Sequence, residues 1–100
     1  MDTRKKMVSK SRAHVFVTGR VQGVLFRYTT KAEAKLRSVK GWTRNLPDGR
    51  LEAVFEGDKD KVEELVDFCH YGPSEAKVSS IEVTWEEYTG EFKEFSIHYR

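Results

Sequence analysis

The sequence has a single cysteine, Cys69, so no disulfide can form within the chain, which fits a reducing compartment. No apolar run approaches the roughly 18 residues that a membrane-spanning helix needs, and the N-terminus lacks the apolar stretch of a secretory signal. We therefore expect a cytoplasmic protein that contacts no membrane. Because free cysteine commonly behaves as a small apolar residue, Cys69 is expected in the core.

Several catalytic motifs are also missing. The chain contains no GxSxG, no GxxxxGK[ST] and no pair of cysteine or histidine residues at metal-ligand spacing. A cysteine phosphatase would need an arginine six positions after its thiolate, where this chain has Glu75. His14, His70 and His98 are scattered and are expected to be strand or helix-end residues. We therefore expect no side-chain nucleophile, no metal and no cofactor.

Length and charge describe one small domain with an uneven charge distribution. A chain of 100 residues with 38% hydrophobic content supports a single modest core. Residues 1–12 carry five Lys or Arg and one Asp, and they are predicted to be a flexible basic arm preceding a domain at 13–100. Residues 13–50 have a net charge of +6 and residues 51–100 have −8. A basic first half followed by an acidic second half favours a small anionic ligand over a nucleic acid.

Hydrophobic periodicity predicts the order β-α-β-β-α-β with an additional short final strand. Strands are expected at 13–18, 42–46, 51–56, 78–86 and 95–99, with a tight turn at 47–49. The first helix is predicted with an apolar stripe of Tyr28, Ala32, Leu36 and Val39. The second is predicted with a capping box of Asp60 and Glu63, an end at 72–73, and a stripe of Val62, Leu65, Val66 and Cys69. This order is typical of an α+β, ferredoxin-like split β-α-β sandwich, in which two helices cover one face of a mainly antiparallel four- to five-stranded sheet.

The segment between the first strand and the first helix resembles an anion-binding loop. Residues 19–27, which we call the cradle loop, read GRVQGVLFR. Gly19 and Gly23 permit tight turns, and Arg27 enters the first turn of the helix, where free N–H groups and the helix dipole favour an anion. A guanidinium there suits phosphate or carboxylate oxygens. The alternative is a purely structural turn.

Asn45 is placed at the same edge of the sheet by the predicted topology. The first two strands of a split β-α-β unit run parallel, so the cradle loop and the end of the second strand open toward one site. An asparagine side chain can accept from a water and donate to an oxyanion, but it is a very poor base. Asn45 could alternatively be a turn former beside the hairpin.

A phosphate loop, an arginine and an amide without a nucleophile suit only a substrate that is already reactive. An acyl phosphate qualifies because its carboxylate is a good leaving group, so the enzyme needs only to position water and compensate charge.

Two stretches, GRVQGVLFR at 19–27 and GWTRNLPDGRLE at 41–52, resemble the two signature motifs of the acylphosphatase family in order and spacing. The resemblance spans residues 12–100 and implies hydrolysis of small acyl phosphates without metal or covalent intermediate. It implies that Arg27 binds the phosphoryl group and Asn45 positions the attacking water. Leu25 and Thr43 depart from the usual pattern, and Leu25 is expected to affect access. The backbone N–H groups implied to complete the phosphate site belong to Gln22, Gly23, Val24, Leu25 and Phe26.

Two other functions remain as alternatives. One is a binding module that holds phosphate or acyl phosphate without hydrolysis, as similar domains occur inside larger carbamoyl-phosphate-handling proteins; a chain that ends at Arg100 is expected to act independently. The other is a ferredoxin-like RNA binder, which Glu52 and Glu56 on the exposed sheet face disfavour. We expect a monomer whose only partner is its small-molecule substrate.

Overall fold

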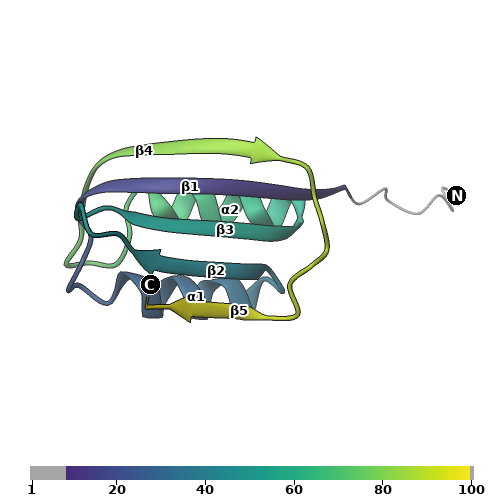
Figure 1. Ribbon diagram of the computed structural model, residues 1–100, viewed down its shortest axis with the longest axis horizontal. Coiled ribbons are helices and arrows are strands. Elements are labelled where there is room, and N and C mark those ends of the chain that lie inside the picture. Colours follow the sequence, from purple (N-terminus) through teal and green to yellow (C-terminus); the bar gives the residue numbers. More distant parts are fainter. Residues whose placement is uncertain (1–8, 100) are drawn as a thin grey trace, which may run out of the picture.

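The computed structural model of the chain describes residues 9–99, which form a five-stranded sheet with both helices on one face (Figure 1). This arrangement confirms the predicted ferredoxin-like α+β fold and the predicted order of elements. The elements are β1 (Lys10–Arg20), α1 (Phe26–Leu36), β2 (Lys40–Asn45), β3 (Leu51–Asp58), α2 (Lys59–Cys69), β4 (Lys77–Glu86) and β5 (Phe95–His98).

The topology of the sheet brings three chain segments to one edge. The strand order is β4-β1-β3-β2-β5, and β1 and β2 each pair antiparallel with β3. Strands β1 and β2 therefore run parallel to each other, as predicted, and β5 pairs parallel with β2. The carboxyl ends of β1, β2 and β5 consequently lie at the same edge, at the left in Figure 1.

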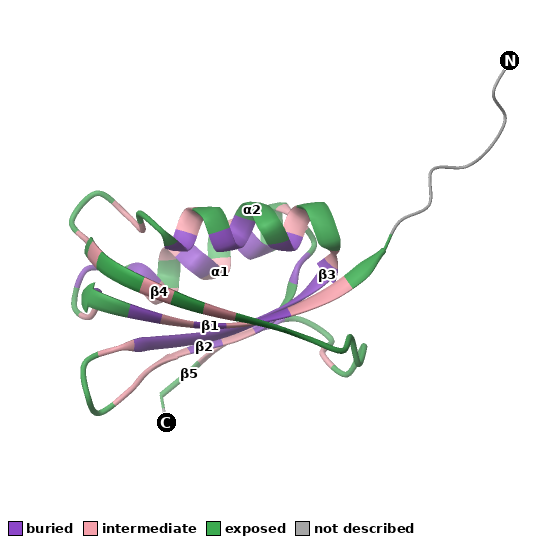
Figure 2. Ribbon diagram, turned by 90° about the horizontal axis from the view of Figure 1, so that it is seen from above, coloured by how far each residue is buried: buried purple, intermediate pink, exposed green. Residues whose placement is uncertain are grey.

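The core lies between the helices and the sheet, where the buried residues concentrate in Figure 2. Strand alternation places every second residue of the two central strands on this side. The predicted inward face of β3 and the predicted stripe of α2 are confirmed, because their side chains are all buried. These residues are Leu51, Ala53 and Phe55 of β3, and Val62, Leu65, Val66 and Cys69 of α2.

Three of the four residues in the apolar stripe predicted for α1 are on the wrong face, and only Val39, beyond the end of the helix, is buried as predicted. Tyr28, Ala32 and Leu36 are exposed, and the helix instead buries Phe26, Thr30 and Ala34. The reason lies at its first residue, since the Phe26 ring packs edge-on against Phe68 of α2 with ring centroids 5.8 Å apart. With Phe26 anchored there, the inward positions follow at intervals of four residues, and the small side chains at 30 and 34 let the helix lie close to the sheet.

The predicted start of the first strand and the capping box are also corrected. Strand β1 begins at Lys10, so residues 10–12 belong to the sheet and not to an arm; residues 1–8 of the predicted arm lie outside the described residues. Helix α2 has Asp58 as its N-cap without a side-chain cap bond, because the Asp58 carboxylate accepts from Lys10 Nζ at 2.6 Å. The Asp60 carboxylate accepts from the N–H of Lys61 instead.

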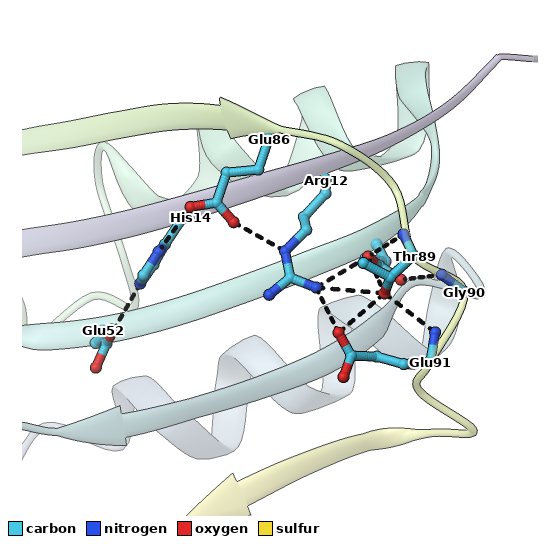
Figure 3. A network of polar contacts seen from close by, with 8 residues as sticks. Arg12, His14, Glu52, Glu86, Thr89, Gly90 and Glu91 are labelled. Atoms are coloured by element: carbon cyan, nitrogen blue, oxygen red, sulfur yellow. Dashed lines mark hydrogen bonds and ion pairs between the residues drawn. The ribbon is translucent and has the colours of Figure 1, made fainter.

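A polar network at the opposite edge of the sheet holds the connection between β4 and β5 (Figure 3). Glu56 on β3 is 2% exposed and accepts from the N–H and hydroxyl of Thr89, both at 2.8 Å, from the N–H of Gly90 at 2.9 Å, and from Arg12 Nη1 at 3.1 Å. Arg12 also pairs with Glu86 and Glu91. The network therefore directs the chain back across the sheet so that β5 can pair with β2.

Candidate active site

The cradle loop and Asn45 face one cavity at the carboxyl edge of the sheet. The cavity has a volume of about 220 Å³, and Gly23, Leu25, Arg27, Asn45 and Tyr99 are among the residues that line it. The loop leaves β1, Asn45 ends β2, and Tyr99 follows β5, so all three parallel strands contribute. The structure thus brings together the two residues that the sequence placed at one edge.

The cradle loop presents backbone N–H groups without internal acceptors. Gly23 and Leu25 both have positive φ, at 75° and 64°, and Leu25 is the N-cap of α1. Within residues 9–99, the backbone N–H groups of residues 22–25 donate no hydrogen bond to a backbone carbonyl in a loop or turn. The N–H groups in the first turn of α1 likewise have no carbonyl acceptor within the helix. A β-carbon at Gly23 would meet no atom within 4 Å, so this part of the loop is open to a ligand.

Val24 and Phe26 take part in the loop only through their backbones. Val24 is 7% exposed and Phe26 is 2% exposed, so both side chains belong to the core. A β-carbon at Gly72 would lie 2.4 Å from the Phe26 ring, which shows how closely the turn after α2 packs on that ring. The alternation of buried and exposed side chains therefore fixes the loop backbone against the core.

Arg27 is half-buried in the first turn of α1 and carries a charge that no carboxylate within residues 9–99 neutralises by an ion pair. Its Cζ atom lies 5.1 Å from the centroid of the Tyr99 ring, a cation–π contact. No hydrogen bond within residues 9–99 engages the N–H donors of this guanidinium, so they are available to an anion.

Asn45 lines the cavity and carries an unpaired acceptor. Its Oδ1 atom is buried and has no hydrogen-bond partner among residues 9–99. Buried polar atoms are nearly always hydrogen-bonded, so an orphan acceptor in a cavity beside a cation indicates a site for a water or ligand donor. Asn45 also precedes the turn, since Leu46 and Arg50 close the hairpin with an N–H to carbonyl bond of 2.8 Å.

Gln22 makes a side-chain contact that the sequence interpretation missed. Its side-chain Nε2 donates to the carbonyl oxygens of Leu46 at 2.8 Å and Arg50 at 3.0 Å, and so ties the cradle loop to the hairpin that carries Asn45. No signal in the sequence points to this contact, because its acceptors are backbone carbonyl oxygens 24 and 28 positions away.

The other candidate groups are core, strand or helix-end residues, as expected, and none of them is among the residues that line the cavity. Cys69 is fully buried on α2, and burial raises the pKa of its thiol to about 12. His14 bridges Glu52 and Glu86 on the exposed sheet face, while His70 caps α2 and His98 ends β5. No three His, Cys, Asp or Glu side chains within residues 9–99 are arranged to hold a metal ion. None of the helices of this region is long and apolar enough to cross a membrane.

Comparison with known proteins assigns the family. The family model described as acylphosphatase matches residues 13–97. An acylphosphatase of Roseiflexus sp. is 52% identical over 91 residues, covering 91% of this chain and 98% of that protein. One from Chloroflexus aurantiacus is 56% identical over 86 residues, covering 86% and 94%.

The solved structures agree with the sequence comparisons. The crystal structure of acylphosphatase from Bacillus subtilis superposes with a TM-score of 0.85 at 37% identity, covering 89% of this chain and 99% of that one. Both the family model and the relatives extend over most of the chain. The chain therefore belongs to the acylphosphatase family of enzymes.

Proposed function

We propose that the chain hydrolyses small acyl phosphates to a carboxylate and orthophosphate, with Arg27 and the cradle loop binding the phosphoryl group and Asn45 positioning the attacking water. One observation supports these roles above the others. Arg27, which has no ion pair within residues 9–99, and Asn45, whose buried Oδ1 lacks a hydrogen-bond partner there, line the same cavity. A cation and an amide that could accept a water proton thus meet at one site.

The proposed reaction mainly requires that the phosphoryl group and the attacking water be held in position. Arg27 donates to the phosphoryl oxygens, and the free N–H groups of the loop complete their hydrogen bonds, so charge on these oxygens is stabilised in the transition state. Asn45 Oδ1 accepts from the water and directs its oxygen at phosphorus. As the new P–O bond forms, the bond to the acyl oxygen breaks and its electron pair leaves on the carboxylate. Both water protons leave with the orthophosphate product.

A carboxylate is a weak base, so this leaving group needs no general acid. The cavity is consistent with a reaction that needs no general acid, because the described residues that line it include no histidine, carboxylate or cysteine. The same chemistry explains why a phosphate monoester, whose alkoxide leaves poorly, would not be turned over at this site.

Hydrolysis of benzoyl phosphate tests the proposal. We expect turnover that persists in excess EDTA and falls by at least about 100-fold in Arg27→Gln, because the main charge on the phosphoryl site is removed. The matched control is Arg37→Gln, which removes the same charge at the C-cap of α1, where Arg37 pairs with Glu33 and Glu64. Its turnover should stay within about twofold.

Two results would contradict the proposal. Unimpaired turnover in Arg27→Gln would remove its assigned role. Calorimetry that shows phosphate binding by the unaltered chain, together with no hydrolysis of benzoyl phosphate, would select the alternative of a binding module.

A further inference from the structure

The wall of the cavity beside Arg27 and Asn45 is apolar. Leu25, Tyr28, Ile97 and Tyr99 contribute to it, and Arg27 is the only charged residue among the described residues of the lining. A site that bound only a phosphate would have no use for such a wall. An acyl phosphate, in contrast, carries its acyl carbon only two bonds from phosphorus, so its acyl group must lie next to the residues that surround Arg27.

Exposed apolar side chains gather at this cavity. Leu25, Tyr28 and Tyr99 are 69%, 67% and 76% exposed, and they are three of the seven large hydrophobic residues that are exposed within residues 9–99. All three line the same cavity. Apolar groups gathered around a concave site commonly mark a binding surface, because they are covered when the ligand arrives.

Leu25 is held in an unfavourable conformation at this position. Its φ and ψ are 64° and 23°, the left-handed region that glycine or asparagine adopts far more readily than leucine. A bulky residue kept in this region at a candidate site suggests that its side chain is used there. The loop conformation leaves the Leu25 side chain exposed at the cavity, where an acyl group could cover it.

Tyr99 reaches the site through the pairing of β5 with β2. The parallel register places Arg44 opposite His98, so Tyr99 follows at the level of Asn45. The guanidinium of Arg27 lies over its ring, and its large exposed fraction leaves part of the ring free. Tyr99 can therefore orient Arg27 and also contact a group attached to the phosphate that Arg27 holds.

We propose that the wall formed by Leu25 and Tyr99 is a subsite for the acyl group and selects apolar, above all aromatic, monocarboxylic acyl phosphates. This inference rests on the proposed function and adds a substrate class to it. An acyl phosphate with a second carboxylate is disfavoured, since the described lining offers no cation besides Arg27. Tyr99 is a specificity-determining residue that also positions Arg27.

The test compares benzoyl phosphate with acetyl phosphate, using the ratio of their kcat/KM values. Because the two substrates differ in intrinsic reactivity, the informative quantity is the change in this ratio on substitution. Tyr99→Ala should lower the ratio by at least about fivefold, mainly through a higher KM for benzoyl phosphate, because a ring contact is lost. Tyr99→Phe keeps the ring and should retain the ratio within about twofold.

Two further variants support the comparison. Leu25→Gly removes the other side of the subsite while relieving the left-handed conformation, and should lower the ratio by at least about twofold without loss of folding. Tyr88→Ala removes an exposed tyrosine that closely follows the end of β4 in the chain, and should leave the ratio unchanged. Strand β4 ends at the opposite edge of the sheet from β1, β2 and β5 (Figure 1).

The outcomes separate this inference from the proposed function. An unchanged ratio in Tyr99→Ala and Leu25→Gly, or equal losses for both substrates, would overturn the acyl subsite while leaving hydrolysis intact. If the unaltered chain hydrolyses neither substrate, the proposed function fails, and calorimetry with benzoylphosphonate and acetylphosphonate tests the subsite alone. Tighter binding of benzoylphosphonate that is lost in Tyr99→Ala would support the subsite, and equal affinities would overturn it.

Discussion

The side-chain amide of Gln22 donates a hydrogen bond to the carbonyl oxygen of Leu46 at 2.8 Å, across the gap between the cradle loop and the β2–β3 hairpin. A second bond from the same nitrogen reaches the carbonyl oxygen of Arg50 at 3.0 Å. Leu46 directly follows Asn45, so Gln22 fixes the hairpin that carries Asn45 relative to the loop that leads to Arg27. One amide therefore links directly the two segments that carry the proposed catalytic residues.

Gln22→Ala is expected to lower kcat for benzoyl phosphate by about tenfold, since a small displacement of Asn45 misplaces the attacking water. It should also lower the free energy of unfolding by about 1 kcal/mol, because the carbonyl oxygens of Leu46 and Arg50 each lose one donor and keep their backbone donor within the hairpin. Steady-state kinetics and urea unfolding measure the two effects.

A double-mutant cycle with Asn45→Ala shows whether Gln22 acts through Asn45. If it does, Gln22→Ala should reduce kcat much less in the Asn45→Ala background than in the unaltered chain. Full additivity of the two effects would show that Gln22 acts independently of Asn45, and the positioning role would be abandoned.

Gly41→Ala is expected to destabilise the fold by at least about 3 kcal/mol, because the added β-carbon would lie 1.8 Å from the carbonyl oxygen of Val54 in the neighbouring strand. Its φ of 137° adds strain for any other residue. Gly49 in the hairpin turn is the control: its φ is 96°, but a β-carbon there meets nothing within 4 Å. Gly49→Ala should cost only about 1 kcal/mol, and equal costs by urea unfolding would contradict this account.

The carboxylate of Glu56 links stability to pH. Burial opposes its ionisation, but hydrogen bonds from Thr89, Arg12 and Gly90 outweigh burial and hold the pKa of Glu56 below its ordinary value of 4.5. A carboxyl group with a lowered pKa in the folded state stabilises the fold at pH values above its unfolded pKa. This stabilisation should disappear as the pH falls below 4.5 and through the pKa of the folded state.

Glu56→Gln should therefore lower the free energy of unfolding by about 2–3 kcal/mol at pH 7, and the difference from the unaltered chain should shrink as the pH falls below 4.5. Urea unfolding from pH 7 to pH 3 measures both effects. The control is Glu64→Gln, whose exposed carboxylate pairs with Arg37 and should contribute less than about 1 kcal/mol. A constant difference across the pH range would contradict the linkage.

The sequence was sufficient to predict which residues meet at the site, but not which side chains contact one another within the fold. Strand periodicity and the order of elements were sufficient to place Arg27 and Asn45 at one edge, because parallel strands in this topology leave little freedom. The inward face of α1 was predicted wrongly, since Tyr28 and Leu36 are as apolar as the residues that are actually buried. The choice between the two faces depends on the contact of Phe26 with Phe68, which lie 42 positions apart and which periodicity cannot detect.

The same limit applies to Arg12 and Gln22. Arg12 lies in a basic stretch that resembles a solvated arm, yet it pairs with Glu56 and Glu86, which are far from it in the sequence. Gln22 was predicted to contribute its N–H, whereas its side chain binds carbonyl oxygens 24 and 28 positions away. Long-range polar contacts of this kind depend on register and side-chain geometry, which composition and spacing do not determine.

The division of roles between Arg27 and Asn45 is tested most directly by Asn45→Ala. We expect kcat for benzoyl phosphate to fall by at least about 100-fold, a barrier increase of about 2.7 kcal/mol or more, because the water is no longer directed at phosphorus. The inhibition constant of orthophosphate should stay within about threefold, since Arg27 and the cradle loop still bind it. An unchanged kcat, or a loss of orthophosphate binding as large as the loss of turnover, would contradict the proposed mechanism.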